Sequence, residues 1–466
     1  MAMNTDPTVL LTPQGRELLT RLAAEPNGGG TALALAVRLR REYPADLVAA
    51  ATAQHELRLA ARAKFSRAME MLFTRAGYEQ SSSEPIARYR AARFGAARRI
   101  ADLCCGIGGD LLALASGREV LGVDRDEVHA RLALHNAGVY GEAANVRAVV
   151  ADVRDIRLAG LDAVFIDPAR RSGPGTASPT AGAASAIARA ASATAGAASA
   201  RTVAAASGTP RRFRTGQSEP PLDWCFALAE RMPAVCVKAA PGLPADLIPA
   251  AWEAEFIADG RDLKEAVLWS PALATAPVAG SGGPRRALVL SGSGAHALVA
   301  CPGDPVPVTE PGEYLLDPNP AVTRAGLVED LARFLSGGAG GAGSAGAGSG
   351  GAADGGRDRD VAKIDPQIAF LTLNRPVQTP FARTLRVLDS APWNEKRFAK
   401  RLRELGIGAA DIRRRGLAGD VDQIHRRLKL AGPHRATIVI TRVNDRPWGL
   451  ICTDAAAPTP ARATVH

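Results

Sequence analysis

The sequence has no long hydrophobic run of the kind that crosses a membrane. Its most continuous stretch of small apolar residues, 181–206, is interrupted by Arg189 and Arg201 and lacks the Leu, Ile and Phe content that lipid requires. The first residues, MAMNTDPTVLL, also lack the basic start and apolar stretch of a secretory signal. We therefore expect a cytoplasmic protein with no membrane partner.

Cysteine motifs are absent as well. Six cysteines are spread over 466 residues, with no Cys-x-x-Cys pair and no Cys/His spacing typical of zinc. The adjacent Cys104 and Cys105 would close a strained ring if they were bridged, so we interpret them as packing residues at the end of a strand. The sequence thus predicts a reduced protein without a metal, and it gives no indication of the oligomeric state.

Lysine is scarce, and the positive charge is unevenly distributed. The chain has 57 Lys and Arg against 47 Asp and Glu, and only seven of the basic residues are lysine. Residues 361–466 hold 19 basic and 9 acidic residues, whereas the other 360 residues hold 38 of each. A basic module beside a neutral one predicts a polyanionic partner, with nucleic acid as the first candidate.

Changes of pattern divide the chain into domains. Residues 8–98 space their apolar residues at intervals of three and four, which predicts four or five helices, one of them over RAMEMLFTRAGYEQ. From residue 99 to about 270, short apolar runs alternate with helical stretches, which predicts β-α-β units and a parallel, doubly wound α/β sheet. We therefore expect a helical domain at 1–98, an α/β domain at 99–335 with a low-complexity insertion at about 173–209, a flexible Gly/Ala linker at 336–359 and a small basic α/β domain at 360–455.

The short apolar runs identify individual strands. Those expected to be buried and parallel are RRIADLCC, REVLGVD, VRAVVAD, LDAVFID and AVCVKAAPG, and further strands are expected over EFIADGRDLKEAVLWS and RRALVLS. In the last domain the pattern predicts helices over NEKRFAKRLRELG and DVDQIHRRLKLAG, and strands over RTLRVLDS and ATIVITRV.

The stretch IADLCCGIGGDL, residues 100–111, matches neither of two common nucleotide-binding patterns. Gly106-Ile107-Gly108 begins the dinucleotide fingerprint, but Leu111 stands where that fingerprint needs Gly or Ala. No Gly-Lys-Ser/Thr follows, so the phosphate-binding loop pattern is absent too. Glycines at this position still permit close backbone approach to some other ligand.

Aspartates stand at or near the ends of four successive predicted strands. Asp102 lies beside the glycine loop, Asp124 follows Gly106 by 18 residues, and Asp152 and Asp167 close the third and fourth strands. Because ligands bind at the carboxyl ends of parallel strands, we expect these carboxylates to converge on one crevice. There Asp124 would accept ribose hydroxyls and Asp152 an adenine amino group. Each aspartate alone is also typical of a helix cap or turn, but the joint pattern favours an adenosyl ligand.

These motifs resemble those of the class I S-adenosylmethionine-dependent methyltransferases. DLCCGIGGD is similar to their glycine-rich motif, GVD to the ribose motif, ADV to the adenine motif and DPAR to the catalytic motif. Further stretches, including ARAKFSRAMEMLFTRAGYEQ, VKAAPGL, LKEAVLW and TPFARTLRVLD, resemble a bacterial family that joins such an enzyme to a C-terminal THUMP-like domain. The resemblance covers nearly the whole chain and implies a Rossmann-like sheet, S-adenosylmethionine as cofactor and an RNA partner, tRNA or rRNA. The cofactor-binding residues that it implies are Asp102, Cys104, Gly106, Gly108, Gly109, Asp124 and Asp152, with Asp110 as the alternative to Asp102 at the amino acid end.

The catalytic motif departs from its usual form. In relatives that methylate amines, Asp or Asn precedes two prolines and an aromatic residue, whereas this chain has Asp167, Pro168, Ala169 and Arg170. We expect Arg170 or Arg171 to stack on a base or bind a phosphate in place of the aromatic residue, with a solvated loop as the alternative.

Basic residues are the candidate RNA contacts. Lys238 ends a predicted strand at the edge of the crevice, where it contacts either RNA or a structural salt-bridge partner. In the basic domain we expect RNA phosphates to be followed by Arg413, Arg414, Arg415, Arg426 and Arg427, with Lys396, Lys400, Arg403 and Lys429 on the same helices.

The resulting hypothesis is a methyltransferase that delivers a methyl group to a base nitrogen of RNA docked by the basic domain. Carbon methylation through a cysteine nucleophile is disfavoured, because Cys225 and Cys236 are predicted to lie inside a helix and a strand. The alternatives are a methyltransferase of small molecules or proteins, and a non-catalytic RNA-binding protein with a retired methyltransferase fold.

Overall fold

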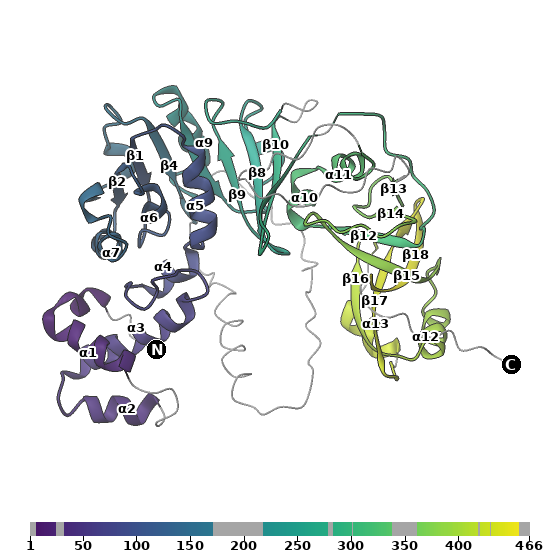
Figure 1. Cartoon of the computed structure of the whole chain (residues 1–466), viewed down its shortest axis with the longest axis horizontal. Coiled ribbons are helices and arrows are strands. Elements are labelled where there is room, and N and C mark those ends of the chain that lie inside the picture. Colours follow the sequence, from purple (N-terminus) through teal and green to yellow (C-terminus); the bar gives the residue numbers. More distant parts are fainter. Residues whose placement is uncertain are drawn as a thin grey trace. The chain divides into compact units, whose positions relative to one another are not determined.

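The computed structural model describes residues 6–24, 32–170, 218–277, 283–300, 302–337, 361–417, 420–428 and 430–455 (Figure 1). Its chain divides into two compact units, which are described separately. The first holds the N-terminal residues, Arg214–Glu253 and Ala266–Thr275, and the second holds Ala254–Glu265 and Ala276–His466. Four features expected from the sequence lie outside the described residues: the insertion at 173–209, most of the linker at 336–359, Arg171 and Lys429.

The first unit begins with helices. They are the 3-10 helix η1 (Pro7–Leu11), α1 (Pro13–Ala24), α2 (Ala32–Leu39), α3 (Ala45–Ala61), α4 (Arg75–Gln80) and α5 (Glu84–Arg93). Leu10 of η1, Leu18 of α1 and Val48 of α3 are fully buried. Gly15 lets α1 approach η1 closely, because a Cβ there would lie 2.5 Å from the Cα of Leu10.

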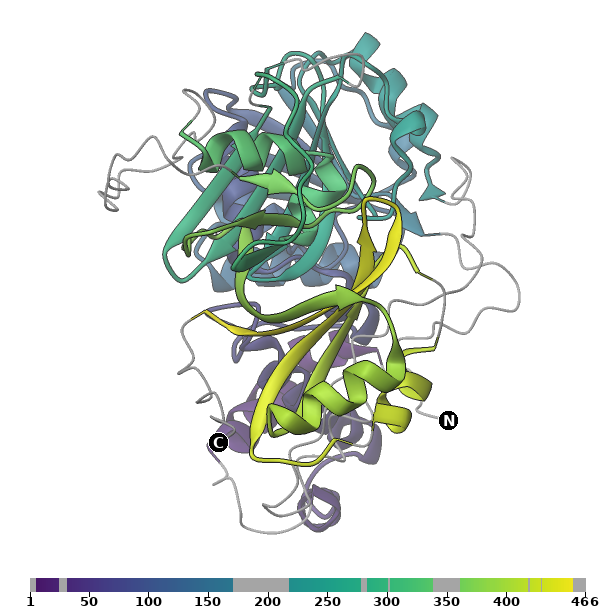
Figure 2. The same ribbon diagram turned by 90° about the vertical axis from the view of Figure 1, so that its right-hand side faces the viewer.

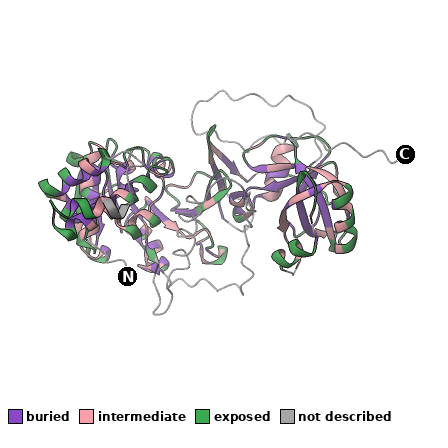
Figure 3. Cartoon of the chain, turned by 90° about the horizontal axis from the view of Figure 1, so that it is seen from below, coloured by how far each residue is buried: buried purple, intermediate pink, exposed green. Residues whose placement is uncertain are grey.

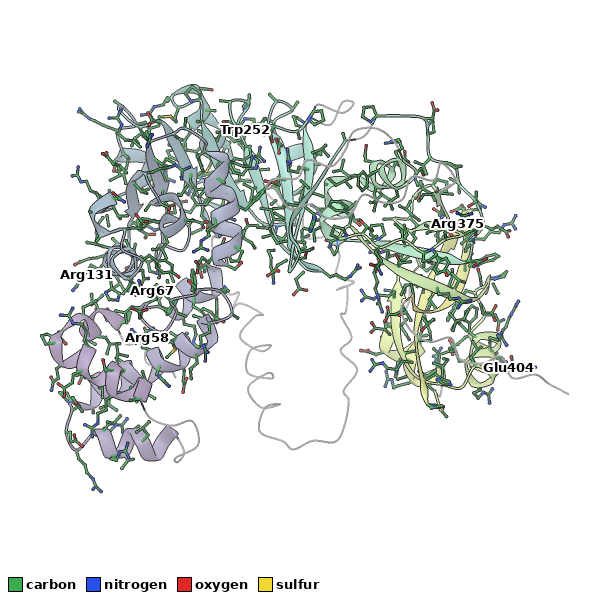
Figure 4. The ribbon with its side chains drawn as sticks, in the orientation of Figure 1. Arg58, Arg67, Arg131, Trp252, Arg375 and Glu404 are labelled. Atoms are coloured by element: carbon green, nitrogen blue, oxygen red, sulfur yellow. The ribbon has the colours of Figure 1, made fainter. Side chains whose placement is uncertain are left out.

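Between α3 and α4 the chain forms turns up to residue 70 and then a non-helical stretch, residues 71–74, so the helix predicted over RAMEMLFTRAGYEQ is wrong except for α4. Met71, Leu72 and Phe73 are at most 1% exposed, and three consecutive residues cannot all lie on one buried face of a helix. Other side chains bind this backbone instead. The amide oxygen of Asn136 accepts the N–H of Leu72 at 2.9 Å. Arg58, which Figure 4 labels, donates from Nε to the carbonyl of Met71 at 2.8 Å.

The predicted buried strands form a parallel sheet in the first unit. They are β1 (Arg99–Leu103), β2 (Glu119–Asp124), β3 (Val146–Val150), β4 (Ala163–Ile166) and β7 (Val235–Ala239), in the order β7-β4-β1-β2-β3. Between them lie α6 (Leu111–Leu114), α7 (Glu127–Val139), η2 (Ala143–Asn145), η3 (Val153–Asp155), the short strands β5 (Ala169–Arg170) and β6 (Ser218–Glu219), α9 (Leu222–Ala227) and η5 (Leu228–Glu230).

The sheet is not parallel throughout. After η6 (Ala245–Leu247), the chain forms β8 (Glu253–Asp259), β9 (Asp262–Trp269), β10 (Arg285–Ser291) and β11 (Gly294–Val299), and the full order is β11-β10-β8-β9-β7-β4-β1-β2-β3. Strand β9 is antiparallel to β7, and β10 is antiparallel to β11. Only two residues, Gly260 and Arg261, join β8 to β9, and such a short turn reverses the chain. Gly260 has the positive φ of 56° that this turn requires. The doubly wound sheet expected from the sequence is thus parallel over its first five strands and carries antiparallel pairs toward its other edge.

The second unit contains a separate seven-stranded sheet in the order β13-β14-β12-β15-β18-β17-β16. Figure 2 shows α12 and α13 lying across one face of its C-terminal strands, where Phe398, Leu402 and Leu428 join Ile438 and Ile451 in a core. The helices and strands predicted here from the sequence are confirmed. The elements are β12 (Tyr314–Pro318), α10 (Pro320–Ala325), α11 (Val328–Leu335), β13 (Ala362–Lys363), β14 (Leu371–Leu373), β15 (Ala382–Pro392), α12 (Glu395–Glu404), β16 (Ile407–Arg414), α13 (Val421–Leu428), β17 (His434–Val443) and β18 (Arg446–Asp454).

Strand β12 belongs to a different sheet from the one that its position in the sequence predicts. Its residues fall within the range 99–335, yet it pairs with β14 and β15 in the seven-stranded sheet. The domain boundaries otherwise stay a prediction. The strands of both sheets are largely buried, whereas the outer faces of the helices are exposed (Figure 3). Among the helices that the structure describes, none has the length and apolar character needed to span a membrane.

Candidate active site

The glycine loop leaves β1 through residues in the left-handed region. Cys104, Gly106 and Gly108 have φ values of 63°, 54° and 89°. A Cβ on Gly108 would lie 3.1 Å from the Cα of Ala133, so this glycine lets the loop pack on α7. A Cβ on Gly106 would meet nothing within 4 Å. The backbone at Gly106 is therefore the open part of the loop.

Asn136 of α7 binds the glycine loop through a hydrogen bond to its backbone. It is fully buried in α7, and its Nδ2 donates to the carbonyls of Ile107 at 2.9 Å and Leu72 at 3.0 Å. Asn136 thus connects the glycine loop to Leu72 in the non-helical stretch 71–74. The sequence analysis missed Asn136, although a polar residue on the apolar face of the helix EVHARLALHNAG was a signal for it.

Asp124 lies at the end of β2 and binds the same loop. Its Oδ2 accepts the N–H of Gly106 at 2.9 Å, its Oδ1 accepts the N–H of Asp126 at 2.9 Å, and His129 Nδ1 lies 3.7 Å from Oδ1. Burial alone raises the pKa of Asp124, but hydrogen bonding from His129 and these two N–H groups outweighs it and keeps this pKa below its usual value. The contact with Asp124 likewise raises the pKa of His129. A carboxylate has about four acceptor positions, so Asp124 keeps capacity for further donors.

Asp152 follows β3 as a capping residue. Its carboxylate accepts the N–H of Arg154 at 2.9 Å and forms an ion pair with the guanidinium of Arg154 at 3.0 Å. Arg154 also pairs with Glu219 of β6. The side chain of Asp152 is 41% exposed, so it remains accessible to a further partner.

Asp102 is the most unusual of the four aspartates. It is 1% exposed in β1, and neither of its carboxylate oxygens has a hydrogen-bond partner among the described residues. Burial, followed by repulsion from Asp110 and Asp167, raises the pKa of Asp102 well above its usual range. A buried carboxyl group without partners is costly unless something binds it. Asp102 is therefore a candidate to bind a polar group of a ligand.

Asp167, Asp110 and two basic residues surround Asp102. Lys238 Nζ donates to Asp167 Oδ2 at 2.7 Å and lies 4.0 Å from Asp110 Oδ2. Arg90 of α5, itself 1% exposed, donates to Asp110 Oδ1. Asp110 therefore stands at the start of α6 without capping it, because its side chain points to Arg90. Lys238 is 11% exposed and occupied by Asp167, as in the salt-bridge alternative, so we do not retain it as an RNA contact.

The catalytic motif continues into a short ladder. Asp167 is 33% exposed, and its N–H bonds the carbonyl of Leu103, which anchors it beside β1. Pro168 is buried, and Ala169 pairs with Glu219 in the two-stranded β5–β6 sheet. The side chain of Arg170 lies outside the described residues.

The cationic candidates of the second unit lie on different elements. Arg413 and Arg414 are the last two residues of β16 and point to opposite faces of the sheet, and Arg415 follows the strand. Arg415 pairs with the buried Asp317 at 2.9 Å, and its guanidinium lies 4.6 Å from the ring centroid of Phe370. Because Arg415 Nη1 also donates to the carbonyl of Ala369 at 2.9 Å, both ends of its guanidinium have partners, and we remove it from the candidate RNA contacts. Of the candidates named from the sequence, those exposed on α12 and α13 are Lys396, Lys400, Arg403, Arg426 and Arg427.

Comparison with known proteins places this geometry in a family. Residues 97–187 match the RNA cap guanine-N2 methyltransferase family, residues 382–454 a THUMP domain-like family, and residues 5–61 a domain of unknown function. Two curated proteins of Mycobacterium tuberculosis, strains CDC 1551 / Oshkosh and H37Rv, are each 32% identical to this chain over 385 residues, covering 80% of this chain and 85% of theirs. Each is described as an uncharacterized S-adenosylmethionine-dependent methyltransferase. The chain belongs to the S-adenosylmethionine-dependent methyltransferases.

A solved structure shares the fold of this methyltransferase. It is a candidate methyltransferase from Porphyromonas gingivalis W83, which superimposes with a TM-score of 0.67 over 95% of this chain and 99% of that chain at 18% identity. The Rossmann-like sheet with a separate C-terminal α/β region is thus confirmed.

Cys225 and Cys236 are not placed to act as nucleophiles. Cys225 is fully buried in α9, and burial raises its pKa to about 12. Cys236 is fully buried within β7. Within the described ranges, no group of His, Cys, Asp and Glu side chains has the arrangement of a metal site.

Proposed function

We propose that this methyltransferase transfers a methyl group to a nitrogen atom of an RNA base, in tRNA or rRNA. The single observation that carries the proposal is the cluster at the ends of β1 and β4. There the buried carboxyl group of Asp102, which has no hydrogen-bond partner among the described residues, lies beside a partly exposed carboxylate, Asp167, that Lys238 contacts. The match of residues 97–187 to an RNA methyltransferase family and of residues 382–454 to a THUMP-like family supports RNA as the substrate.

The residues present fit S-adenosylmethionine. Bound there, this cofactor supplies an electrophilic methyl group on a sulfonium. Asp102 would accept hydrogen bonds from the amino acid end, and the open backbone at Gly106 gives that end close access. Asp124 would accept ribose hydroxyls at its remaining lone pairs, and Asp152 would accept the adenine amino group.

Asp167 and Pro168 would position the target amine. Asp167 Oδ2 is bound to Lys238, while Oδ1 has no hydrogen bond among the described residues. An exocyclic amine that donates to Oδ1 and to the Pro168 carbonyl would aim its nitrogen lone pair along the line of displacement. Such positioning is the main source of acceleration in this type of transfer.

RNA docking is assigned to the exposed faces of α12 and α13. Their cations are solvent-accessible, and Arg427, whose side chain is 56% exposed, has Glu395 at 3.7 Å as its ion-pair partner among the described residues. Contacts of this kind bind phosphates without reading the sequence, which suits a module that positions RNA.

The test is methylation of purified tRNA and rRNA with labelled S-adenosylmethionine, followed by mass spectrometry of nucleosides. We expect one N-methylated nucleoside, and we expect Asp167→Ala to abolish it while cofactor affinity stays within about threefold. Asp155→Ala, which changes an exposed aspartate of η3, is the matched control and should keep full activity. Methylation of a protein or small molecule with no product on RNA would overturn the proposal, and so would failure to bind the cofactor.

A further inference from the structure

A cavity of about 470 Å³ lies in the second unit, away from the residues discussed so far. It is formed by the turn between β8 and β9, the end of β10 and the segment that leads into β15. Its polar side chains are Arg261, Ser291, Ser293, Gln378, Thr379 and Arg383, and none of the described residues lining it is acidic. A lining of guanidinium, hydroxyl and amide groups without a carboxylate suits an anion.

Arg261 is held at one wall of this cavity by a buried acid. Its Nη2 donates to Asp317 Oδ2 at 2.8 Å, and Asp317 is 2% exposed in β12. Because Asp317 also pairs with Arg415, one carboxylate stands between two guanidiniums. The Arg261 side chain is still 37% exposed, so its donors remain accessible from the cavity.

Arg383 lies directly opposite Asp317 in the β12–β15 pair and points to the same face. It pairs with Asp454 at 2.7 Å, but Asp454 is 58% exposed and its charge is largely screened by water. Burial lowers the pKa of Arg261, and repulsion by Arg413, Arg383 and Arg415 lowers it further against the attraction of Asp317. The guanidiniums around this cavity thus repel one another, and an anion between them would relieve that repulsion.

We propose that this cavity binds a phosphodiester of the RNA backbone, with Arg261 and Arg383 as its two guanidinium contacts. The inference rests on the proposed function, since RNA is the polyanion that the enzyme would meet. Neither arginine belongs to the α12–α13 surface, so the site would be a separate contact. Guanidiniums bind phosphate oxygens in a bidentate manner, which favours phosphate over a weakly held counter-ion.

The test uses the full chain and fluorescently labelled bulk bacterial tRNA across a salt series. We expect Arg383→Gln to weaken binding about three- to tenfold and to reduce the magnitude of the salt slope by about 0.7–0.9, the loss of one phosphate contact. Gln378→Glu, an isosteric change at an exposed lining residue, should weaken binding similarly by placing a negative charge in the cavity. Arg383→Lys should restore part of the affinity.

Arg442→Gln is the matched control. Arg442 lies in β17 of the same sheet, is 30% exposed against 26% for Arg383, and pairs with the exposed Asp445, but it does not line the cavity. It should bind tRNA as the wild type does. Unchanged affinity and salt slope in both Arg383→Gln and Gln378→Glu would overturn the inference while leaving RNA methylation intact. Wild-type protein that neither binds nor methylates RNA would instead overturn the proposed function.

Discussion

Lys238 Nζ lies 2.7 Å from Asp167 Oδ2, so the lysine at the end of β7 orients the carboxylate at the end of β4. Both are in the first unit, on neighbouring strands. In the proposed function Asp167 would bind the target amine, and Lys238 would act on the amine through Asp167. We therefore propose Lys238 as a positioning residue.

Replacing Lys238 tests this role. Lys238→Met should lower kcat at least tenfold, because Asp167 loses the contact that fixes its rotamer, while the KM for S-adenosylmethionine stays within about threefold. Lys238→Arg should recover part of kcat, which a purely structural role would not require. Steady-state kinetics at saturating substrate measure both effects, and an unchanged kcat in Lys238→Met would contradict the assignment.

Asp102→Asn should separate stability from cofactor binding. Because the pKa of Asp102 is raised on folding, its contribution to stability is greatest below the unfolded pKa of about 4 and is lost as the pH rises through the folded pKa. The neutral variant avoids this loss, so its Tm without cofactor should exceed that of the wild type at pH 8. This difference should shrink toward pH 5. Calorimetry should also show at least tenfold weaker S-adenosylmethionine binding, and equal Tm values at both pH values would refute the account.

The His129–Asp124 pair predicts a second pH dependence. The pKa of His129 is raised, so its stabilising contribution is complete below pH 6.5 and disappears as the pH rises through the higher folded value. His129→Gln should therefore destabilise the protein at pH 6 and have little effect at pH 9. Urea denaturation at the two pH values measures this. His135, whose pKa is lowered, offers a control, because His135→Gln should not show the same pattern.

Asn136→Leu should loosen the glycine loop. The change leaves the N–H and carbonyl of Leu72 and the carbonyl of Ile107 without their present partner, at a cost of about 2–4 kcal/mol in the free energy of unfolding. The cofactor KM should rise as well, since the loop that approaches the ligand is less well held. Asn145→Ala, at a partly exposed position in η2, should cost less than about 1 kcal/mol. Equal losses of unfolding free energy in the two variants would contradict the proposed role of Asn136 in holding the glycine loop.

Periodicity was sufficient wherever a pattern is local. The alternation of apolar runs and helical stretches identified β1, β2, β3, β4 and β7, and the basic C-terminal region yielded α12 and α13. The prediction of a helix from periodicity was wrong over residues 67–74, where Asn136 and Arg58, distant in sequence, bind the backbone. A helical spacing carries no record of such competing hydrogen bonds.

The candidate site also has a part that the sequence predicted and a part that only the tertiary structure decided. The sequence by itself determined the glycine loop and an aspartate at the end of each of four strands, because both follow from the order of residues along a strand and its following turn. Only the tertiary structure decided what each aspartate does. Asp124 and Asp152 have partners, Asp102 has none among the described residues, and Asp167 is bound to a lysine 71 residues away. Partners so distant in sequence meet through strand register and burial, and these are properties of the packed sheet rather than of any local pattern.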